Sequence, residues 1–80
     1  MSLKNLVETA VQMLVEEPDA VTVEESDDRG TKVFEVRVAP PDVGRVIGKE
    51  GRVITCVRQL VGAAGAKEQT RAVVKVITDD

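Results

Sequence analysis

Apolar and polar residues recur along the chain with two different periods, and the changes between these periods divide it into helices and strands. Across residues 3–15 the apolar positions are three and four apart, which predicts an amphipathic helix. Ser2 is a suitable N-cap for this helix, and Pro18 prevents the helix from continuing further. The predicted buried face consists of Leu3, Leu6, Val7, Ala10, Met13 and Leu14.

Two stretches with a period of two follow, over residues 20–25 and 32–39. Such alternation predicts strands that bury one face. Residues 26–30, a run of Ser, Asp, Arg and Gly, have the composition of a turn, so the two strands are expected to form an antiparallel hairpin. The predicted inner side consists of Val21, Val23, Phe34, Val36 and Val38.

The second half of the chain predicts two more helices and a strand. Two prolines end the preceding strand and begin a short helix over residues 42–47, which Gly48 stops. A longer helix is expected to begin after Gly51 and run to about Ala64, followed by a loop over residues 65–70 and a strand over residues 71–78. The buried stripe of the longer helix is predicted to be Val53, Val57, Leu60, Val61 and Ala64.

This order, α-β-β-α-α-β, restricts the topology. The two helices between the second and third strands make a crossover long enough to place those strands parallel. We therefore predict a two-layer α+β domain over residues 1–80: a three-stranded mixed sheet, with the second strand in the middle, covered on one face by three helices.

The composition excludes most catalytic chemistry. The 80 residues include no His and one Cys, so Ser-His and Cys-His pairs are absent, and Cys56 can form neither an intrachain disulfide nor a zinc site. We expect no enzyme, cofactor or metal. A small nuclease would need metal ligands from carboxylate pairs, either residues 27–28 or residues 79–80, which are better interpreted as a turn and a tail. Without an apolar span or signal peptide, the chain is expected to be cytoplasmic and not bound to membranes.

The net charge of −3 is unevenly distributed. Residues 1–30 contain eight acids and two bases, whereas residues 31–80 contain nine bases and six acids. The bases are densest over residues 45–58, where Glu50 is the single acid. The acidic excess argues against indiscriminate coating of nucleic acid but permits one local phosphate contact. The bases of this segment are Arg45, Lys49, Arg52 and Arg58.

Two glycines three residues apart, Gly48 and Gly51, interrupt a helical pattern that resumes at once. Glycine costs about 1 kcal/mol in a helix relative to alanine, so the pair indicates a tight bend that another molecule can approach. The following helix N-terminus would attract an anion, and Lys49 would add charge. Alone, the spacing is also compatible with a tight connection between two helices. It matches neither the Walker nor the dinucleotide-binding glycine pattern.

The whole of residues 42–54, DVGRVIGKEGRVI, resembles the KH-domain signature, in which Ile-Gly-x-x-Gly lies between two helices of a β-α-α-β unit. The order α-β-β-α-α-β resembles the type II version of that fold. Because the resemblance covers the whole chain, the sequence is most similar to the small stand-alone bacterial KH proteins of the KhpA family.

The resemblance implies that single-stranded RNA, or sometimes single-stranded DNA, lies across the GxxG loop, which grips about four nucleotides of backbone. It implies an RNA chaperone or post-transcriptional regulator that acts as a homodimer or with a second KH-domain protein. Loop contacts would come from Gly48, Lys49, Glu50, Gly51 and Arg52. An apolar wall for the bases would come from Val43, Gly44, Ile47 and Ile54, with Arg45 and Arg58 as flanking phosphate contacts.

Two residues qualify this interpretation. Phe34 is the single aromatic residue and is expected in the core, so any base-binding surface must be aliphatic. The carboxylate of Glu50 either leaves the loop with almost no net charge or interacts favourably with the positive N-terminus of the next helix. The alternative function is a KH-fold protein-interaction module with little RNA binding, whose contacts we would place over residues 58–64. Cys56 on that helix is expected to be a buried or idle thiol.

Overall fold

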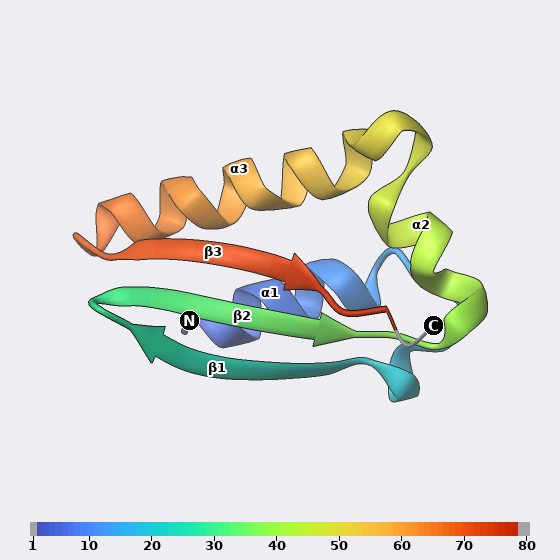
Figure 1. Cartoon of the computed structure of the whole chain (residues 1–80). Helices are drawn as coiled ribbons and strands as arrows, with labels where there is room; N and C mark the ends of the chain where they lie inside the picture. Colours follow the sequence, from blue (N-terminus) through green and yellow to red (C-terminus); the bar gives the residue numbers. More distant parts are fainter. Residues whose placement is uncertain (1, 79–80) are drawn as a thin grey trace.

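The computed structural model describes residues 2–78, and its elements follow the expected order (Figure 1). Short 3₁₀ turns at Pro18–Ala20, Pro40–Asp42 and Lys49–Gly51 connect them. The helices and strands are α1 (Leu3–Gln12), β1 (Thr22–Asp28), β2 (Thr31–Arg37), α2 (Val43–Ile47), α3 (Arg52–Lys67) and β3 (Arg71–Val76).

The sheet has the predicted topology, with strand order β1-β2-β3. β1 and β2 are antiparallel, whereas β3 runs parallel to β2. The hairpin turn is tighter than expected, because the strands pair as far as Asp28 and Thr31. It consists of Arg29 and Gly30, whose φ angles of 55° and 87° belong to the left-handed region favoured in two-residue hairpins. Asp27 accepts a hydrogen bond from the Gly30 amide at 2.9 Å.

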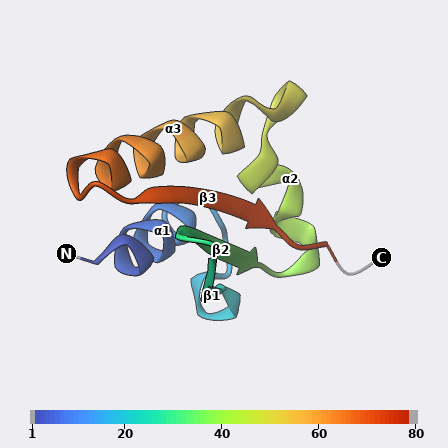
Figure 2. The same cartoon turned by 60° about the vertical axis from the view of Figure 1, so that its left-hand side comes forward.

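The helices cover one face of the sheet, which confirms the two-layer prediction. Figures 1 and 2 show α1 against that face, α3 along β3, and α2 at the end to which the β2 and β3 arrows point. The core fills the space between the layers, and Phe34, as predicted, is completely buried in it. From the other elements, Val7, Val46, Val61 and Val74 contribute to the same core.

α1 ends three residues earlier than the sequence predicted. Ser2 is its N-cap, as expected, and accepts a hydrogen bond from the Asn5 amide at 3.1 Å. At the other end the Leu14 amide bonds to Val11, three residues back, so the helix tightens and stops. The prediction that Met13 is buried is wrong, since its side chain is 81% exposed. The buried positions are Leu3, Val7 and Val11.

α3 continues to Lys67, beyond the predicted end, because Gly65 serves close packing instead of breaking the helix. A Cβ at Gly65 would lie 2.6 Å from the carbonyl oxygen of Thr70, which follows the helix. The buried stripe is Ile54, Val57, Val61 and Gly65. The predicted stripe was therefore partly wrong: Leu60 lies on a flank of the helix and is 50% exposed.

Candidate nucleic-acid interface

The bend between α2 and α3 comprises residues 48–51 and depends on both glycines. α2 ends at Gly48, whose φ is 78°, and Gly51 precedes α3 with a φ of 76°. A Cβ at Gly48 would overlap the Val53 side chain and lie 2.9 Å from the Val53 nitrogen, whereas one at Gly51 would meet open space. Glu50 also has a positive φ, 57°. The chain therefore turns sharply here and leaves its outer side open.

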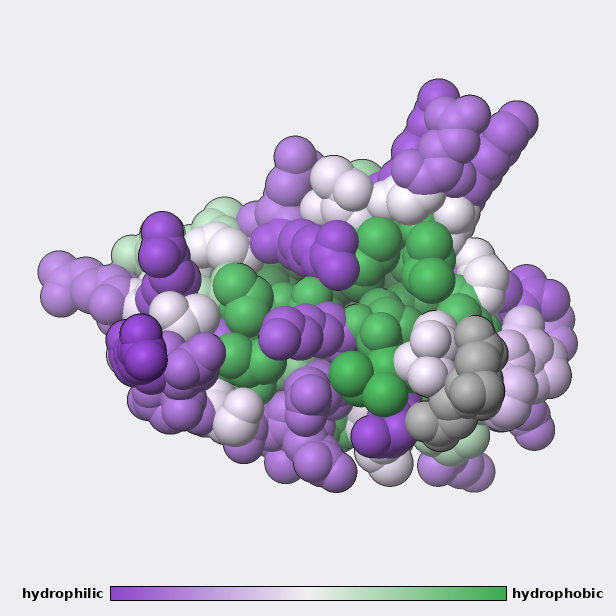
Figure 3. All heavy atoms as spheres, in the orientation of Figure 1, coloured by the Kyte–Doolittle hydropathy of each residue, from purple (hydrophilic) through white to green (hydrophobic). Residues whose placement is uncertain are grey.

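No other segment of residues 2–78 covers the bend. The side chains of Lys49 and Glu50 are exposed, and their main-chain amides have no hydrogen-bond partner within the described residues. Inside the bend, the Gly51 amide donates a hydrogen bond to the Gly48 carbonyl at 3.2 Å, and the Arg52 amide donates to the Lys49 carbonyl. Figure 3 shows a hydrophilic projection at upper right, where Figure 1 places this segment, beside an apolar area. Two amide donors are thus available to a ligand.

The bend carries both signs of charge. Arg52 Nη2 lies 3.5 Å from Glu50 Oε2, and both side chains are largely exposed. Lys49 forms no ion pair within residues 2–78. The ammonium of Lys49 is therefore available to an anion next to the two amides, while Arg52 and Glu50 partly neutralise each other.

α2 places the predicted wall residues and Arg45 on different faces. Val43 and Ile47 are four residues apart and share a face, where both are half-buried. Gly44 is exposed, with open space where a Cβ would be. Arg45 lies two residues from both Val43 and Ile47 and so points to the opposite side. The structure brings three of the predicted wall residues together and separates Arg45 from them.

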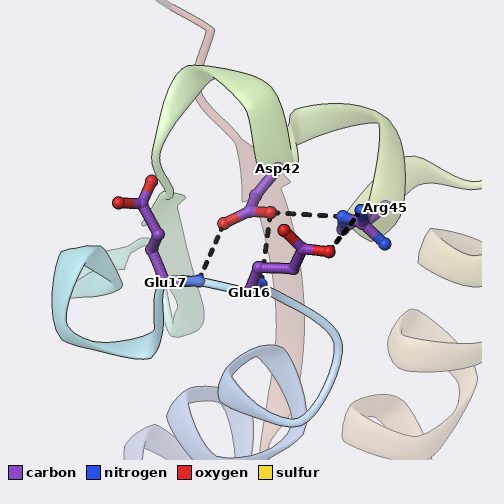
Figure 4. Close-up of polar contacts among 4 residues, drawn as sticks. All are labelled: Glu16, Glu17, Asp42 and Arg45. Atoms are coloured by element: carbon purple, nitrogen blue, oxygen red, sulfur yellow. Dashed lines mark hydrogen bonds and ion pairs between the residues drawn. The ribbon is translucent and has the colours of Figure 1, made fainter.

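Arg45 belongs to a polar cluster around Asp42 (Figure 4). Asp42 is 2% exposed, and its carboxylate accepts hydrogen bonds from the main-chain amides of Glu16 and Glu17 at 3.2 and 3.1 Å. Arg45 Nε lies 3.4 Å from Asp42, and Arg45 Nη2 donates to Glu16 Oε1 at 2.7 Å. The cluster joins the connection between α1 and β1 to the start of α2. Arg45 is therefore held beside two carboxylates, while its side chain remains 51% exposed.

The two remaining predicted residues differ in accessibility. Ile54 is 5% exposed and its side chain packs in the core, so it anchors α3 to the domain and offers little surface to a base. Arg58 is exposed, and its Nε donates to the carbonyl oxygen of Val74 at 3.1 Å. Thr55, between these two, donates its hydroxyl to the Gly51 carbonyl at 2.8 Å and fixes the first turn of α3 to the bend.

Comparison with known proteins identifies the family. The family model of the KhpA/KhpB KH domain matches residues 4–76. The chain belongs to this KH-domain family. The protein named "RNA-binding protein KhpA" of Caldanaerobacter subterraneus subsp. tengcongensis is 46% identical over 72 residues, which cover 90% of this chain and 96% of that protein. The protein of the same name from Clostridium acetobutylicum is 43% identical over 75 residues, 94% of this chain and 100% of that protein.

A solved structure shows the same fold in a larger protein. The crystal structure of Aquifex aeolicus Era Y63A bound to GDP.AlF4⁻ superposes with a TM-score of 0.64 at 18% identity. The match covers 96% of this chain but 31% of the Era chain, so it supports the type II KH fold alone.

The KhpA/KhpB KH family is not an enzyme family, which agrees with the expectation from the sequence. Within residues 2–78, no three His, Cys, Asp or Glu side chains gather to hold a metal ion. Asp27 serves the hairpin turn, and Asp79 and Asp80 lie outside the described residues. No helix of the described chain is long and apolar enough to cross a bilayer.

Sequence reasoning on this KH domain missed the contact between Glu16 and Arg45 and the structural role of Asp42. The sequence pattern places Asp42 at the start of a helix, where Asp commonly occurs. In the structure its side chain makes no capping bond to α2 and instead reaches residues 25 and 26 positions earlier. No local pattern marks such a long-range contact, so only the tertiary structure shows it.

Proposed function

We propose that this KH domain binds single-stranded RNA as a chaperone or post-transcriptional regulator in the cytoplasm, where the free, exposed Cys56 stays reduced. About four nucleotides would lie across residues 48–51 and along the aliphatic face of α2. The observation that supports this most directly is the exposed bend, with the amides of Lys49 and Glu50 and the Lys49 ammonium available. The names of the two bacterial relatives agree with it.

The charge distribution supports the same ligand. α3 and β3 contain five basic residues and no acid, whereas β1 contains four acids and no base. A polyanion is therefore favoured on the side of the molecule formed by α3 and β3. With two or three phosphates neutralised, the plot of log affinity against log salt should have a slope of roughly −1.4 to −2.1.

The test is the double change Lys49→Asp with Glu50→Asp. It reverses the one unpaired charge of the bend, and Asp tolerates the left-handed conformation of residue 50. We expect the variant to lose single-stranded RNA binding in a filter or anisotropy assay, while its circular dichroism and melting temperature stay near those of the wild type.

The chain offers a matched control in its other adjacent Lys-Glu pair. Lys67 and Glu68 are both exposed and lie at the far end of α3, so Lys67→Asp with Glu68→Asp makes the same chemical changes away from the bend. The control should weaken RNA binding far less than the bend variant, because Lys67 contributes to the general charge of α3 and β3 but lies away from the bend. If the bend variant is folded and binds RNA as tightly as the wild type, the proposal is wrong. A single-stranded DNA of the same sequence tests whether the 2′-hydroxyls contribute.

A second function, protein assembly, is favoured by an apolar groove of about 250 Å³ between α1 and α3. Met13 and Leu60 are unusually exposed for large apolar side chains, and Cys56 is exposed between the helices instead of buried. Such a groove suits a second copy of the chain or another KH-domain protein. A stable oligomer that retains no RNA at low salt would favour assembly as the main function. The lining residues are Ala10, Met13, Leu14, Val53, Cys56, Val57 and Leu60.

A further inference from the structure

Arg58 lies where α3 meets the free edge of the sheet. β3 is an edge strand, paired on one side with β2. The Ile77 amide donates a hydrogen bond to the Val36 carbonyl of β2. Successive residues of a strand direct their N–H and C=O groups to opposite sides, so those of Val74, three residues before Ile77, point away from β2. Arg58 Nε donates to the Val74 carbonyl at 3.1 Å on this outer edge. The guanidinium of Arg58 therefore spans the space between α3 and β3.

This contact changes what the edge can bind. The central carbonyl of the edge, that of Val74, is already bonded to Arg58, whereas the amide of Val74 faces the same side. The terminal nitrogens of Arg58 have no partner within residues 2–78. This part of the edge consequently presents mainly hydrogen-bond donors, several of them in the planar, fixed geometry of a guanidinium.

Arg58 is also in line with the bend. Gly51 is the N-cap of α3, and Thr55 and Arg58 follow it by four and seven residues, so the two side chains lie in one row that begins at the bend. Seven residues of helix rise about 10 Å, so a strand that crosses the bend and continues along α3 reaches Arg58. The hydrogen bond from Thr55 to the Gly51 carbonyl lies in the same row. No acidic residue occurs in α3 or β3 to compete for the guanidinium.

We propose that Arg58 is a contact residue that makes the free edge of β3 select a ligand group with two adjacent hydrogen-bond acceptors. This inference rests on the proposed RNA-binding function. Two parts of a nucleic acid have the required chemistry: the non-bridging oxygens of a phosphate, and the O6 and N7 atoms of a guanine base. Adenine has a donor where guanine has O6, so the fork of donors would repel it.

The experiment compares Arg58→Lys and Arg58→Gln with the wild type on short RNAs that differ at one central base: guanine, 7-deazaguanine or adenine. Lys keeps the charge but loses the planar fork, whereas Gln loses both. The matched control is Arg29→Gln, which makes the same charge change in the hairpin turn, at the end of the sheet opposite the bend (Figure 1). Melting temperatures verify that each variant is folded.

We expect Arg58→Gln to weaken binding by about 10-fold, the effect of losing a charge-assisted pair of hydrogen bonds. If the acceptor is guanine, the wild type binds the guanine RNA more tightly than the 7-deazaguanine and adenine RNAs, and both variants lose this preference. If it is a phosphate, every RNA weakens equally under Arg58→Gln and the salt slope falls by about 0.7.

Folded Arg58 variants that bind all three RNAs like the wild type would overturn this inference. The change of Lys49 and Glu50 to Asp separates the two proposals. If that change abolishes binding but the Arg58 variants match the wild type, only the role of Arg58 is wrong. If the wild type retains no RNA at low salt, the proposed function itself fails.

Discussion

Gly48 and Gly51 have nearly the same φ but different surroundings, and this difference makes them separable by mutation. A Cβ at Gly48 would overlap Val53, whereas a Cβ at Gly51 would extend into open space. Gly51→Ala carries the cost of a left-handed helical conformation, about 1–2 kcal/mol for a non-glycine residue. Gly48 combines its positive φ with a ψ of 173°, a conformation essentially restricted to glycine, so Gly48→Ala carries a backbone cost of about 1–3 kcal/mol. Gly48 carries a steric cost in addition. Gly48 thus secures the packing of the bend, and Gly51 keeps its outer surface accessible.

We therefore expect Gly51→Ala to lower the free energy of unfolding by about 1–2 kcal/mol, and Gly48→Ala to lower it further, by about 2–4 kcal/mol in total. Urea unfolding monitored by circular dichroism measures both. Gly51→Ala should weaken RNA binding out of proportion to its stability loss, because its methyl group projects toward the ligand. Equal destabilisation by the two substitutions would contradict this account of Gly48.

The residue pattern predicted this bend well because its signals are local. The glycine spacing, the exposed Lys49 and the helix restart at Arg52 are all adjacent in sequence. The same pattern could not assign Arg45, since its partner Glu16 lies 29 positions away. Nor could it place Ile54, because a one-residue rotation of α3 decides whether Ile54 or Val53 faces the core.

At the scale of elements, Asp42 determines how α2 sits on the rest of the domain. Its carboxylate accepts two amides from the connection between α1 and β1, which is why that connection passes beneath α2. α2 has only five residues and cannot be stable alone. Its position, and that of the bend after it, therefore depends on Asp42 together with the buried side chain of Val46.

We expect Asp42→Ala to lower the free energy of unfolding by about 2–4 kcal/mol, because it leaves the amides of Glu16 and Glu17 without an acceptor at a part-buried site. The matched control is Asp19→Ala, which removes an exposed carboxylate from the neighbouring 3₁₀ turn and should change stability by less than about 0.5 kcal/mol. Chemical denaturation compares the two, and a similar small effect of both would show that the Asp42 cluster is dispensable.

Element order, sheet topology and strand direction were predictable from the sequence, but several element ends were not. Residues 26–28 have turn composition, yet they pair with β2, because cross-strand bonds outweigh the local preference of Ser and Asp. Gly65 resembles a helix stop, yet α3 continues through it, because the close approach of Thr70 requires a residue without a side chain. Both errors arise where tertiary contacts override local propensity.

At the scale of the whole molecule, α3 has two distinct surfaces on opposite flanks. On one flank, Thr55 bonds back to Gly51 of the bend, and Arg58, in the same row, bonds to the free edge of β3. Val53, Cys56 and Leu60 line the apolar groove shared with α1. Because residues two apart on a helix point to different sides, the two surfaces do not overlap. One copy could therefore hold RNA on one flank of α3 and a second copy on the other.

Such an arrangement would compensate for the small contact area of a single domain. Two linked sites can exceed the affinity of one by about 100-fold or more when one RNA spans both. We expect the wild type to sediment as a dimer of the 8.6 kDa chain, and Leu60→Asp to sediment as a monomer, because a carboxylate cannot be buried in the apolar groove without a partner. Analytical ultracentrifugation over a concentration series measures this.

Val73→Asp is the matched control, since Val73 is 37% exposed and lies on the sheet, away from the groove. This variant should remain dimeric.

The length of the RNA then separates a loss of avidity from damage to the RNA site. On an RNA of about four nucleotides, which one domain fills, Leu60→Asp should bind like the wild type. On an RNA long enough for two domains it should bind more weakly. Equal weakening on both lengths would place Leu60 in the RNA site itself, and a wild type that stays monomeric at every concentration would exclude the groove as a self-association surface.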